Sequence, residues 1–306
     1  MTITETHPFS LRQMQYAVAV AETLSFRKAS ELCHVAQPSL SAQIAQMEAA
    51  LGVALFERNK KRVLITSAGN EILERARVLL RDAGDIARAA RRLGDPLSGT
   101  LRLGVIPTIS AYLLPHAAPS LAKAFPRLSV QWLEEKTEQL VEQLQDGTLD
   151  GAIVAREAQL GGVVHQEIAK DEFVLAAPWK ARLGREAAAL PLSELRGEQI
   201  LLLAEGHCLH QQISGLCTRA KASESEFHAT SLPTLVQMVA AGAGITLLPK
   251  LALRVERKRA RLHIRTFQKP VPHRTIVLIW RNGSPLQETM SKLAAEVRAA
   301  YPSDAR

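Results

Sequence analysis

Two cysteines in the second half of the chain, Cys208 and Cys217, have the type and spacing of residues that do redox chemistry. A cysteine reacts as its thiolate, which attacks electrophiles and can pass through a sulfenic acid to a disulfide. His207 precedes Cys208 directly and His210 follows two positions later, so two titratable rings adjoin one thiol along the chain. The segment predicts a redox-active thiol or, in the simpler alternative, two small buried cysteines that never meet.

The spacing between these cysteines limits what a regular structure can do. Nine residue steps span about 13 Å in a helix and up to about 30 Å in a strand, whereas a disulfide requires Cα atoms within roughly 7 Å. Leu209, Ile213 and Leu216 follow a helical spacing, which predicts helical structure between the thiols. If the two thiols join, that structure must unwind or fold.

The third cysteine, Cys33, falls within a short helical pattern near the N-terminus, where we expect it to pack in a core. Three cysteines are too few for the disulfide framework of a secreted domain, and none belongs to a C-x-x-C pair. The sequence therefore predicts no metal site and no cofactor.

The composition is that of a globular protein with a negatively charged partner. The chain has 306 residues, 47% of them hydrophobic, and a formal net charge of +8. Such a charge favours nucleic acid as the partner, with an anionic membrane surface a distant second. The chain contains no apolar run of about 18 residues, and residues 1–8 are mostly polar, so we expect a cytoplasmic protein without membrane contact.

Residues 10–66 carry three short helical patterns, and two of them have the spacing of a helix-turn-helix. The second helix of that pair is predicted over residues 38–51, with Pro38 in its first turn, where a missing N–H costs nothing. Leu40, Ile44 and Met47 give it a buried face. Its exposed N-terminal end is expected to contact bases and phosphates through Gln37, Pro38, Ser39, Ser41 and Gln43.

A basic turn between two apolar arms follows at residues 55–66. Next to a helix-turn-helix, such a turn predicts a wing whose side chains neutralise DNA phosphates, whereas alone it would be a solvated loop. The basic side chains of this turn are Arg58, Lys60, Lys61 and Arg62.

Residues 66–93 contain no proline and predict one long helix, which Thr66 can cap. Apolar residues recur along it at alternating steps of four and three, as in a coiled coil. They are Ile72, Ala76, Leu79, Ala83, Ile86, Ala90 and Leu93. We expect this seam to form a dimer, the alternative being a helix that packs on the core of its own domain.

Residues 94–99 form a Gly- and Pro-containing break, after which strand and helix patterns alternate. Strands are expected near residues 101–106, 128–133, 149–154, 173–177, 200–203, 244–247 and 275–280. The alternation predicts βαβ units, a mostly parallel sheet and two α/β lobes with a ligand or sensor site between them. The expected domains are 1–66, 67–97 and 98–306, with one lobe at about 98–170 plus 275–306 and the other at about 171–274.

The N-terminal motifs closely resemble the signature of LysR-type transcription regulators. The matching segments are residues 26–30, 37–41, 44, 47–48, 51–52, 55–58 and 66–69. The resemblance implies a winged helix-turn-helix, a long linker helix and two Rossmann-like lobes of the periplasmic-binding-protein type. It also implies a dimer of dimers that binds paired sites on double-stranded DNA upstream of a promoter.

The segment around Cys208 resembles the sensing loop of the peroxide-sensing branch of this family, including the spacing to Cys217. Further matches lie at residues 106–108, 112–116, 229–232, 238–242, 244–249 and 274–276. The resemblance implies a peroxide pocket formed by Thr108, Thr137, His207 and Arg274. Taken singly, the threonines would be helix N-caps, the histidine a loop residue and the arginine a surface ion-pair partner.

By this resemblance, hydrogen peroxide oxidises Cys208, Cys217 resolves the product to a disulfide, and the regulator activates genes of oxidative-stress defence. RNA polymerase and a cellular thiol reductant are the further partners that it implies. One alternative is a LysR-type regulator that binds a metabolite between its lobes. Another is a thiol peroxidase, which we disfavour because an enzyme of that kind needs no helix-turn-helix. Many relatives have Arg-Asp where this chain has His210-Gln211, which removes two charges near the thiol.

Overall fold

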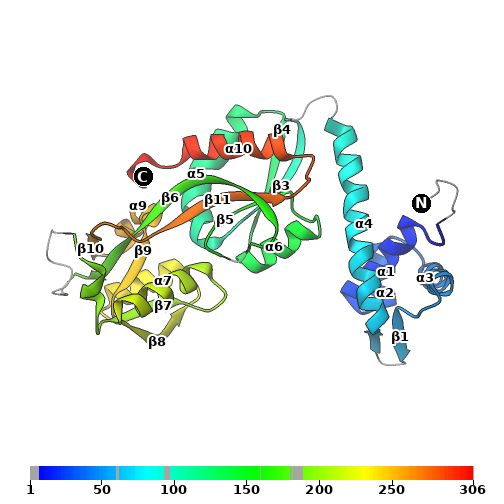
Figure 1. The fold of residues 1–306 in the computed structure, drawn as a ribbon, viewed down its shortest axis with the longest axis horizontal. Helices are drawn as coiled ribbons and strands as arrows, with labels where there is room; N and C mark the ends of the chain where they lie inside the picture. Colours follow the sequence, from blue (N-terminus) through cyan, green and yellow to red (C-terminus); the bar gives the residue numbers. More distant parts are fainter. Residues whose placement is uncertain are drawn as a thin grey trace. The chain divides into compact units, whose positions relative to one another are not determined.

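A computed structural model describes residues 7–59, 62–92, 97–158, 160–179, 181 and 189–305. The chain divides into two compact units, Met1–Arg91 and Arg92–Arg306, which are described separately (Figure 1). Among the predicted contact residues, Lys60, Lys61 and Leu93 lie outside the described residues, as do the side chains of Arg58 and Ala90.

The first unit holds three helices, a two-stranded hairpin and a long helix, as the sequence predicted. Their bounds are α1 Leu11–Thr23, α2 Phe26–Leu32, α3 Gln37–Leu51, β1 Phe56–Asn59, β2 Arg62–Ile65 and α4 Ser67–Arg92. The Ser10 hydroxyl caps α1 by accepting a hydrogen bond from the backbone amide of Gln13. The Gln13 side chain accepts one from the backbone amide of Ser10, which completes a capping box. Leu40, Ile44 and Met47 of α3 are buried in the core of this unit.

The long helix α4 starts against the base of the hairpin. The Thr66 hydroxyl accepts a hydrogen bond of 2.8 Å from the Gly69 amide, and a Cβ atom at Gly69 would lie 2.3 Å from the Leu55 carbonyl oxygen. The residues of the predicted seam differ in their exposure along the helix. Ala76 is buried in the core of its own unit, whereas Leu79 is 47% exposed and Ile86 is 71% exposed. Ala76 therefore does not belong to an open dimer face.

The second unit alternates strands and helices. Its elements are β3 Gly99–Val105, α5 Pro107–Ala124, β4 Leu128–Glu134, α6 Thr137–Gln145, β5 Gly151–Ala155, β6 Val163–Pro178, η1 Leu192–Leu195, β7 Gln199–Leu203, α7 Cys208–Ala220, β8 Ser223–Ala229, α8 Leu232–Ala240, β9 Thr246–Pro249, α9 Lys250–Arg259, β10 Leu262–Thr266, β11 His273–Arg281, α10 Gln287–Ala300 and η2 Ser303–Ala305. None of the helices within the described ranges is long and apolar enough to cross a membrane.

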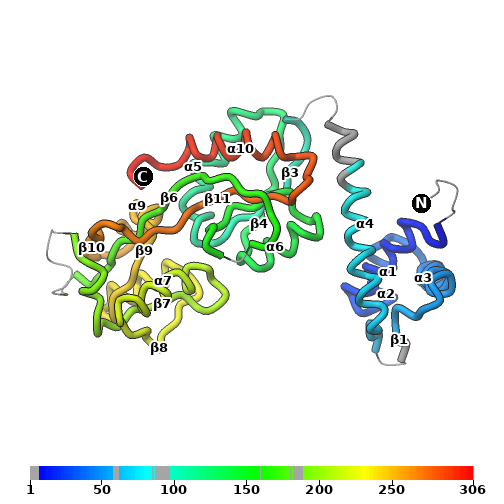
Figure 2. The backbone as a smooth tube through the Cα atoms, viewed as in Figure 1, coloured from blue at the N-terminus to red at the C-terminus, as the bar shows by residue number. Residues whose placement is uncertain are grey.

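The main sheet has the strand order β10-β6-β11-β5-β3-β4, with β9 also paired to β6, and β7 pairs with β8 separately. The expectation of a mostly parallel sheet is wrong, because β6 and β11 pair antiparallel with each other and with their other neighbours. The cause is topological. The chain leaves one lobe along β6 and returns along β11, and these two strands lie side by side in Figures 1 and 2.

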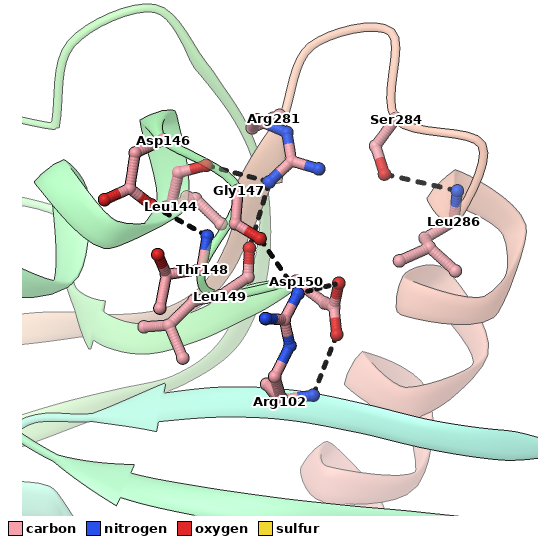
Figure 3. A network of polar contacts seen from close by, with 10 residues as sticks. All are labelled: Arg102, Leu144, Asp146, Gly147, Thr148, Leu149, Asp150, Arg281, Ser284 and Leu286. Atoms are coloured by element: carbon pink, nitrogen blue, oxygen red, sulfur yellow. Dashed lines mark hydrogen bonds and ion pairs between the residues drawn. The ribbon is translucent and has the colours of Figure 1, made fainter. Parts of the chain in front are cut away.

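A polar network fixes the end of β11 in the first lobe (Figure 3). Arg281 donates hydrogen bonds to the carbonyl oxygens of Leu144 and Leu149, at 2.8 and 2.9 Å. Beside it, the buried Asp150 accepts a hydrogen bond of 2.8 Å from the Arg102 amide and lies 3.4 Å from the Arg102 guanidinium. This region of the lobe is therefore held by buried arginine and aspartate side chains.

Candidate redox site and nucleic-acid interface

Cys208 is the first residue of α7, and the turn before it brings α6 and α7 together at their N-terminal ends. Gly206 in that turn has φ +85°, and a Cβ atom there would lie 3.0 Å from the Lys136 Nζ atom. Lys136 is the N-cap of α6, and its Nζ donates a long hydrogen bond of 3.4 Å to the Glu205 carbonyl. A residue with a side chain at position 206 would be strained by this positive φ and would displace the end of the Lys136 side chain.

The two threonines of the predicted pocket lie in the first turns of helices, but neither is an N-cap. Ile106 caps α5 and Lys136 caps α6, so the hydroxyls of Thr108 and Thr137 are available for other contacts. Both side chains are buried. The Thr137 hydroxyl forms no hydrogen bond of normal length, yet it lies close enough to Cys208 to favour the charged form of the thiol.

Arg274 on β11 joins Thr108 to a residue that the sequence did not single out. Its Nη1 donates to the Thr108 hydroxyl at 2.8 Å and its Nη2 to the Thr108 carbonyl at 3.0 Å. Its Nε donates to Asp171 Oδ2 at 2.9 Å, and both charged side chains have 0% exposure. Arg274 is therefore fully buried, which rules out the alternative of a surface ion pair.

Asp171 lies on β6 directly opposite Arg274 in the strand register. Its Oδ1 accepts a hydrogen bond of 2.9 Å from the Leu251 amide in the first turn of α9. Burial raises the pKa of Asp171, and the guanidinium of Arg274 and the Leu251 amide oppose that rise. The one sequence signal was the acidic pair Asp171 and Glu172 immediately before the apolar run 173–177.

The environment of the Cys208 thiol contains opposing influences on its pKa. Burial raises the pKa above that of an ordinary thiol and is the largest effect. Arg274, then Thr137, and then the backbone amides of Leu209 and Cys208 itself lower it. Of the neighbours expected to favour a thiolate, Arg274 and Thr137 do so and His207 does not, and burial outweighs them in this reduced conformation. The thiol is therefore mostly protonated at neutral pH.

The two histidines near the thiol have different surroundings. Burial lowers the pKa of His207, Lys136 and His210 lower it further, and a hydrogen bond with the Thr230 backbone partly opposes the change. His207 is therefore mostly neutral at pH 7. His210 Nδ1 lies 2.7 Å from the Leu203 carbonyl oxygen, and its ring contacts that of His228 edge to face at 5.7 Å. His210 is thus directed toward β7 and β8.

Two cavities reach Cys208, and Gln211 and Ala158 line both of them. One has a volume of about 280 Å³ and extends toward Phe173 and Gln212. The other has a volume of about 290 Å³ and extends toward the start of α6. Each is large enough for a small polar molecule. Of His210 and Gln211, the two residues expected to distinguish this segment, Gln211 is therefore the one that lines the approaches to Cys208.

Cys217 lies near the other end of the same helix. Both cysteines are free thiols, and α7 is unbroken from Cys208 to Ala220, which separates their Cα atoms by about 13 Å. Burial raises the pKa of Cys217 to about 11, and the carboxylate of Glu224 adds to that rise. The geometry is that of a reduced pair that cannot join while α7 is intact.

The helix-turn-helix presents its predicted contact residues at the start of α3. Gln37, Pro38 and Ser39 are exposed, and Ser41 and Gln43 are half-buried. Glu48 of α3 accepts hydrogen bonds from the amides of Leu55 and Phe56 at 2.8 and 3.2 Å. One carboxylate thereby fixes α3 to the first strand of the wing. Cys33 is half-buried against the core of this unit, as expected.

Two families match the chain and together cover most of it. The lysR family of bacterial regulatory helix-turn-helix proteins matches residues 11–70, and the LysR substrate binding domain matches residues 94–302. These matches and the structure confirm the predicted order of a helix-turn-helix unit followed by an α/β regulatory unit.

Individual relatives are similar over nearly the whole length. The DNA-binding transcriptional dual regulator OxyR of Escherichia coli K12 is 42% identical over 295 residues, 95% of each chain. The hydrogen peroxide-inducible genes activator of Dickeya chrysanthemi is 44% identical over 294 residues, 94% of this chain and 95% of the relative. A solved full-length OxyR variant of Pseudomonas aeruginosa has a TM-score of 0.78 and 32% identity, with 98% of both chains covered. The chain therefore belongs to the LysR family of bacterial transcription regulators and, within that family, is similar to OxyR.

Proposed function

We propose that this protein is a transcription regulator that senses hydrogen peroxide through Cys208 and responds by activating genes of oxidative-stress defence. The observation that carries the proposal is the setting of Cys208. It lies at a helix N-terminus under the influence of Arg274 and Thr137, and two cavities lead to it. The relatives named as peroxide-inducible activators support the same assignment.

The chemistry proceeds in two balanced steps. The Cys208 thiolate attacks one oxygen of the peroxide, the O–O bond breaks, and the sulfur becomes a sulfenic acid while hydroxide leaves and takes a proton to form water. The Cys217 sulfur then attacks the sulfenic sulfur and displaces a second water as the disulfide forms. Two electrons pass from the two thiols to one peroxide. A cellular thiol reductant returns them and restores the reduced regulator.

The second step requires α7 to open, because the disulfide shortens a distance of about 13 Å to less than roughly 7 Å. Opening removes the apolar side chains of Leu209, Ile213 and Leu216 from the core that they occupy in the reduced form. The sensor segment and the moving segment are the same helix. Such a repacking of the second lobe is a two-state change of the kind that regulators use.

We further propose that the protein works as a dimer of dimers on paired sites in double-stranded DNA. The exposed Leu79 and Ile86 of α4 support a dimer contact, and the sequence pattern would extend this seam to Ile72, Ala83, Ala90 and Leu93. The start of α3 and the wing would contact DNA, and RNA polymerase would be the partner of the activated form. A chromosomal target places the protein in the cytoplasm at the nucleoid. In this proposal the protein consumes peroxide as a signal and is not an enzyme.

Mass spectrometry after a stoichiometric peroxide pulse tests the proposal. We expect a peptide crosslink between Cys208 and Cys217 and a changed DNA footprint of the oxidised protein on its own promoter. A native protein that stays fully reduced would contradict the proposal, and repeated turnover of peroxide with a reductant would favour a thiol peroxidase instead.

A regulator that binds a metabolite, with inert cysteines, is the second candidate. The observation in its favour is Gln212, whose two amide atoms are buried without a hydrogen-bond partner and which lines the cavity of about 280 Å³ beside Cys208. The Cys208→Ser variant separates the two candidates. Normal promoter activation by this variant under peroxide would favour the metabolite.

A further inference from the structure

The Arg274 guanidinium is held from two opposite sides within the second unit. Thr108 accepts two of its hydrogen bonds, and the Asp171 carboxylate accepts the bond from Nε while Nη2 also lies 2.9 Å from the same oxygen. Arginine has a long side chain with many rotamers, and a carboxylate that pairs with Nε selects few of them. Of these contacts, the one with Asp171 is the charged one.

Asp171 uses its two oxygens for two different elements. Oδ2 binds Arg274 on β11, and Oδ1 accepts the Leu251 amide in the first turn of α9. A carboxylate at a helix N-terminus is favoured both by the unpaired amides and by the helix dipole. The position of Asp171 is therefore fixed by α9 and by its place on β6, and it does not depend on Arg274 alone.

We propose that Asp171 is a positioning residue for the sensor cysteine: it holds the Arg274 guanidinium against Thr108, and Arg274 acts from that position on the Cys208 sulfur. The inference rests on the proposed function for its role in peroxide sensing. Its physical content, the influence of Arg274 on the thiol, does not need peroxide. Asp171 also gives the pocket a direct connection to α9 of the second lobe.

Helix α9 keeps other contacts when Asp171 is substituted. Glu256 near the end of α9 is buried and accepts hydrogen bonds of 2.8 Å from the Tyr112 hydroxyl of α5 and 3.2 Å from Arg259. Leu251 and Ala252 pack in the core of the unit. These contacts keep α9 docked when the bond between Asp171 and Leu251 is lost.

The test compares Asp171→Ala with Asp171→Asn in the full-length reduced protein. Two quantities are measured for the Cys208 peptide by mass spectrometry: the pH profile of its alkylation by iodoacetamide and its rate of oxidation by hydrogen peroxide. In Asp171→Ala the guanidinium is no longer held, so the alkylation profile moves to higher pH and the oxidation rate falls about tenfold or more.

In Asp171→Asn the amide oxygen still accepts the bond from Arg274, but the negative charge is gone. The alkylation profile therefore moves to lower pH, and the oxidation rate stays within about threefold of that of the parent protein. A general loss of stability would not move the two variants in opposite directions. If the alanine variant fails to fold, the direction of the shift in the asparagine variant decides the question.

The control is another arginine–aspartate pair of the same unit, in which the aspartate is buried and the arginine is partly exposed, shown in Figure 3. Asp150 is 1% exposed and pairs with Arg102, and it is not among the groups that affect the Cys208 thiol. We expect Asp150→Ala and Asp150→Asn to leave the alkylation profile of Cys208 unchanged.

Three results would overturn the inference: an unchanged profile in both Asp171 variants, equal losses in both, or equal shifts in the Asp150 controls. A parent protein whose Cys208 alkylates normally but never reacts with peroxide would instead contradict the proposed function. The alkylation profiles would still decide the role of Asp171 in that case.

Discussion

The two ends of α7 place identical side chains in opposite surroundings. At the N-terminal end, Cys208 is influenced by a buried arginine, a threonine hydroxyl and two helix amides, all of which favour its charged form. At the other end, the carboxylate of Glu224 disfavours the charged form of Cys217. One regular element thus produces two unlike thiols, because the ends of a helix differ in polarity and each end packs against different strands.

The two thiols also differ in access, although both are buried. Both thiols are almost completely covered, yet the two cavities beside α6 and β6 are lined by Cys208 and not by Cys217. Cys208 is therefore the cysteine that borders space open to a small molecule. In the proposed mechanism, the sulfur of Cys217 becomes available when α7 opens. This difference assigns the order of the two proposed chemical steps.

The largest expected effect comes from removing each thiol in turn. Cys208→Ser should abolish the peroxide-dependent crosslink and the change in DNA footprint. Cys217→Ser should leave Cys208 able to form a sulfenic acid, which a dimedone probe would trap, but should prevent the intramolecular disulfide. If dimedone traps a sulfenic acid at Cys217 of the Cys208→Ser protein as fast as it does at Cys208 of the parent protein, the two thiols do not differ in reactivity toward peroxide.

The pH dependence should be the next largest effect. Burial raises the pKa of Cys208 above that of an ordinary thiol, so the reactive thiolate is the minor species below that pKa. The oxidation rate of Cys208 should therefore rise about tenfold for each pH unit between pH 6 and pH 8. Stopped-flow oxidation across this range measures the slope. A rate that is already constant below pH 7 would mean that the neighbours outweigh burial.

Arg274→Met should make the thiol at the N-terminal end of α7 more like the one at the C-terminal end. The variant removes the guanidinium that lowers the pKa of Cys208 and keeps much of the side-chain volume. The oxidation rate of Cys208 should fall about tenfold or more at pH 7, while the alkylation of Cys217 in unfolded protein stays unchanged. A thermal unfolding scan checks that the loss does not come from unfolding, since Asp171 is left without its cation. Parent-like oxidation in the variant would exclude Arg274 from the site.

Gly215→Ala acts on the helix between the thiols. A Cβ atom at Gly215 would contact nothing within 4 Å, so alanine fits and stabilises the helix by about 0.5–1 kcal/mol. The disulfide, which needs an open helix, should become about two- to fivefold easier to reduce in a dithiothreitol titration. Sulfenic acid formation at Cys208 should stay the same and is the internal control. An unchanged titration would show that α7 opens elsewhere than at Gly215.

The smallest effect is expected for Glu224→Gln at the C-terminal end. The carboxylate raises the pKa of Cys217, but burial is the larger cause, and Glu224 is exposed to solvent. The pKa of Cys217 should fall slightly, and disulfide formation should speed up by about twofold or less, with the difference shrinking at high salt. An equal effect of the variant on Cys208 alkylation would show that the two ends are not independent.

The sequence predicted those features that depend on local periodicity. The helices of the helix-turn-helix, the wing, α4 and the helical segment between the cysteines all follow from apolar spacing and capping residues. Thr108, Thr137 and Arg274 were assigned by resemblance alone, and the structure joins Thr108 to Arg274 and places Thr137 beside Cys208.

Features that depend on strand pairing were missed. Asp171 gains its role from the register between β6 and β11, which no local pattern encodes. The antiparallel character of the sheet has the same origin. Glu256 of α9 is likewise fully buried and accepts a hydrogen bond from the Tyr112 hydroxyl of α5. In each case the partner lies far away in the sequence.

The most direct test of the account is a site-resolved comparison of the two thiols in one sample. The reduced full-length protein is given one equivalent of hydrogen peroxide at pH 7 in the presence of dimedone, and the adduct is located by peptide mass spectrometry. We expect the sulfenic acid adduct at Cys208, with none at Cys217, and a Cys208–Cys217 disulfide when dimedone is omitted. An adduct that forms first at Cys217, or equally at both cysteines, would contradict the assignment of Cys208 as the sensor.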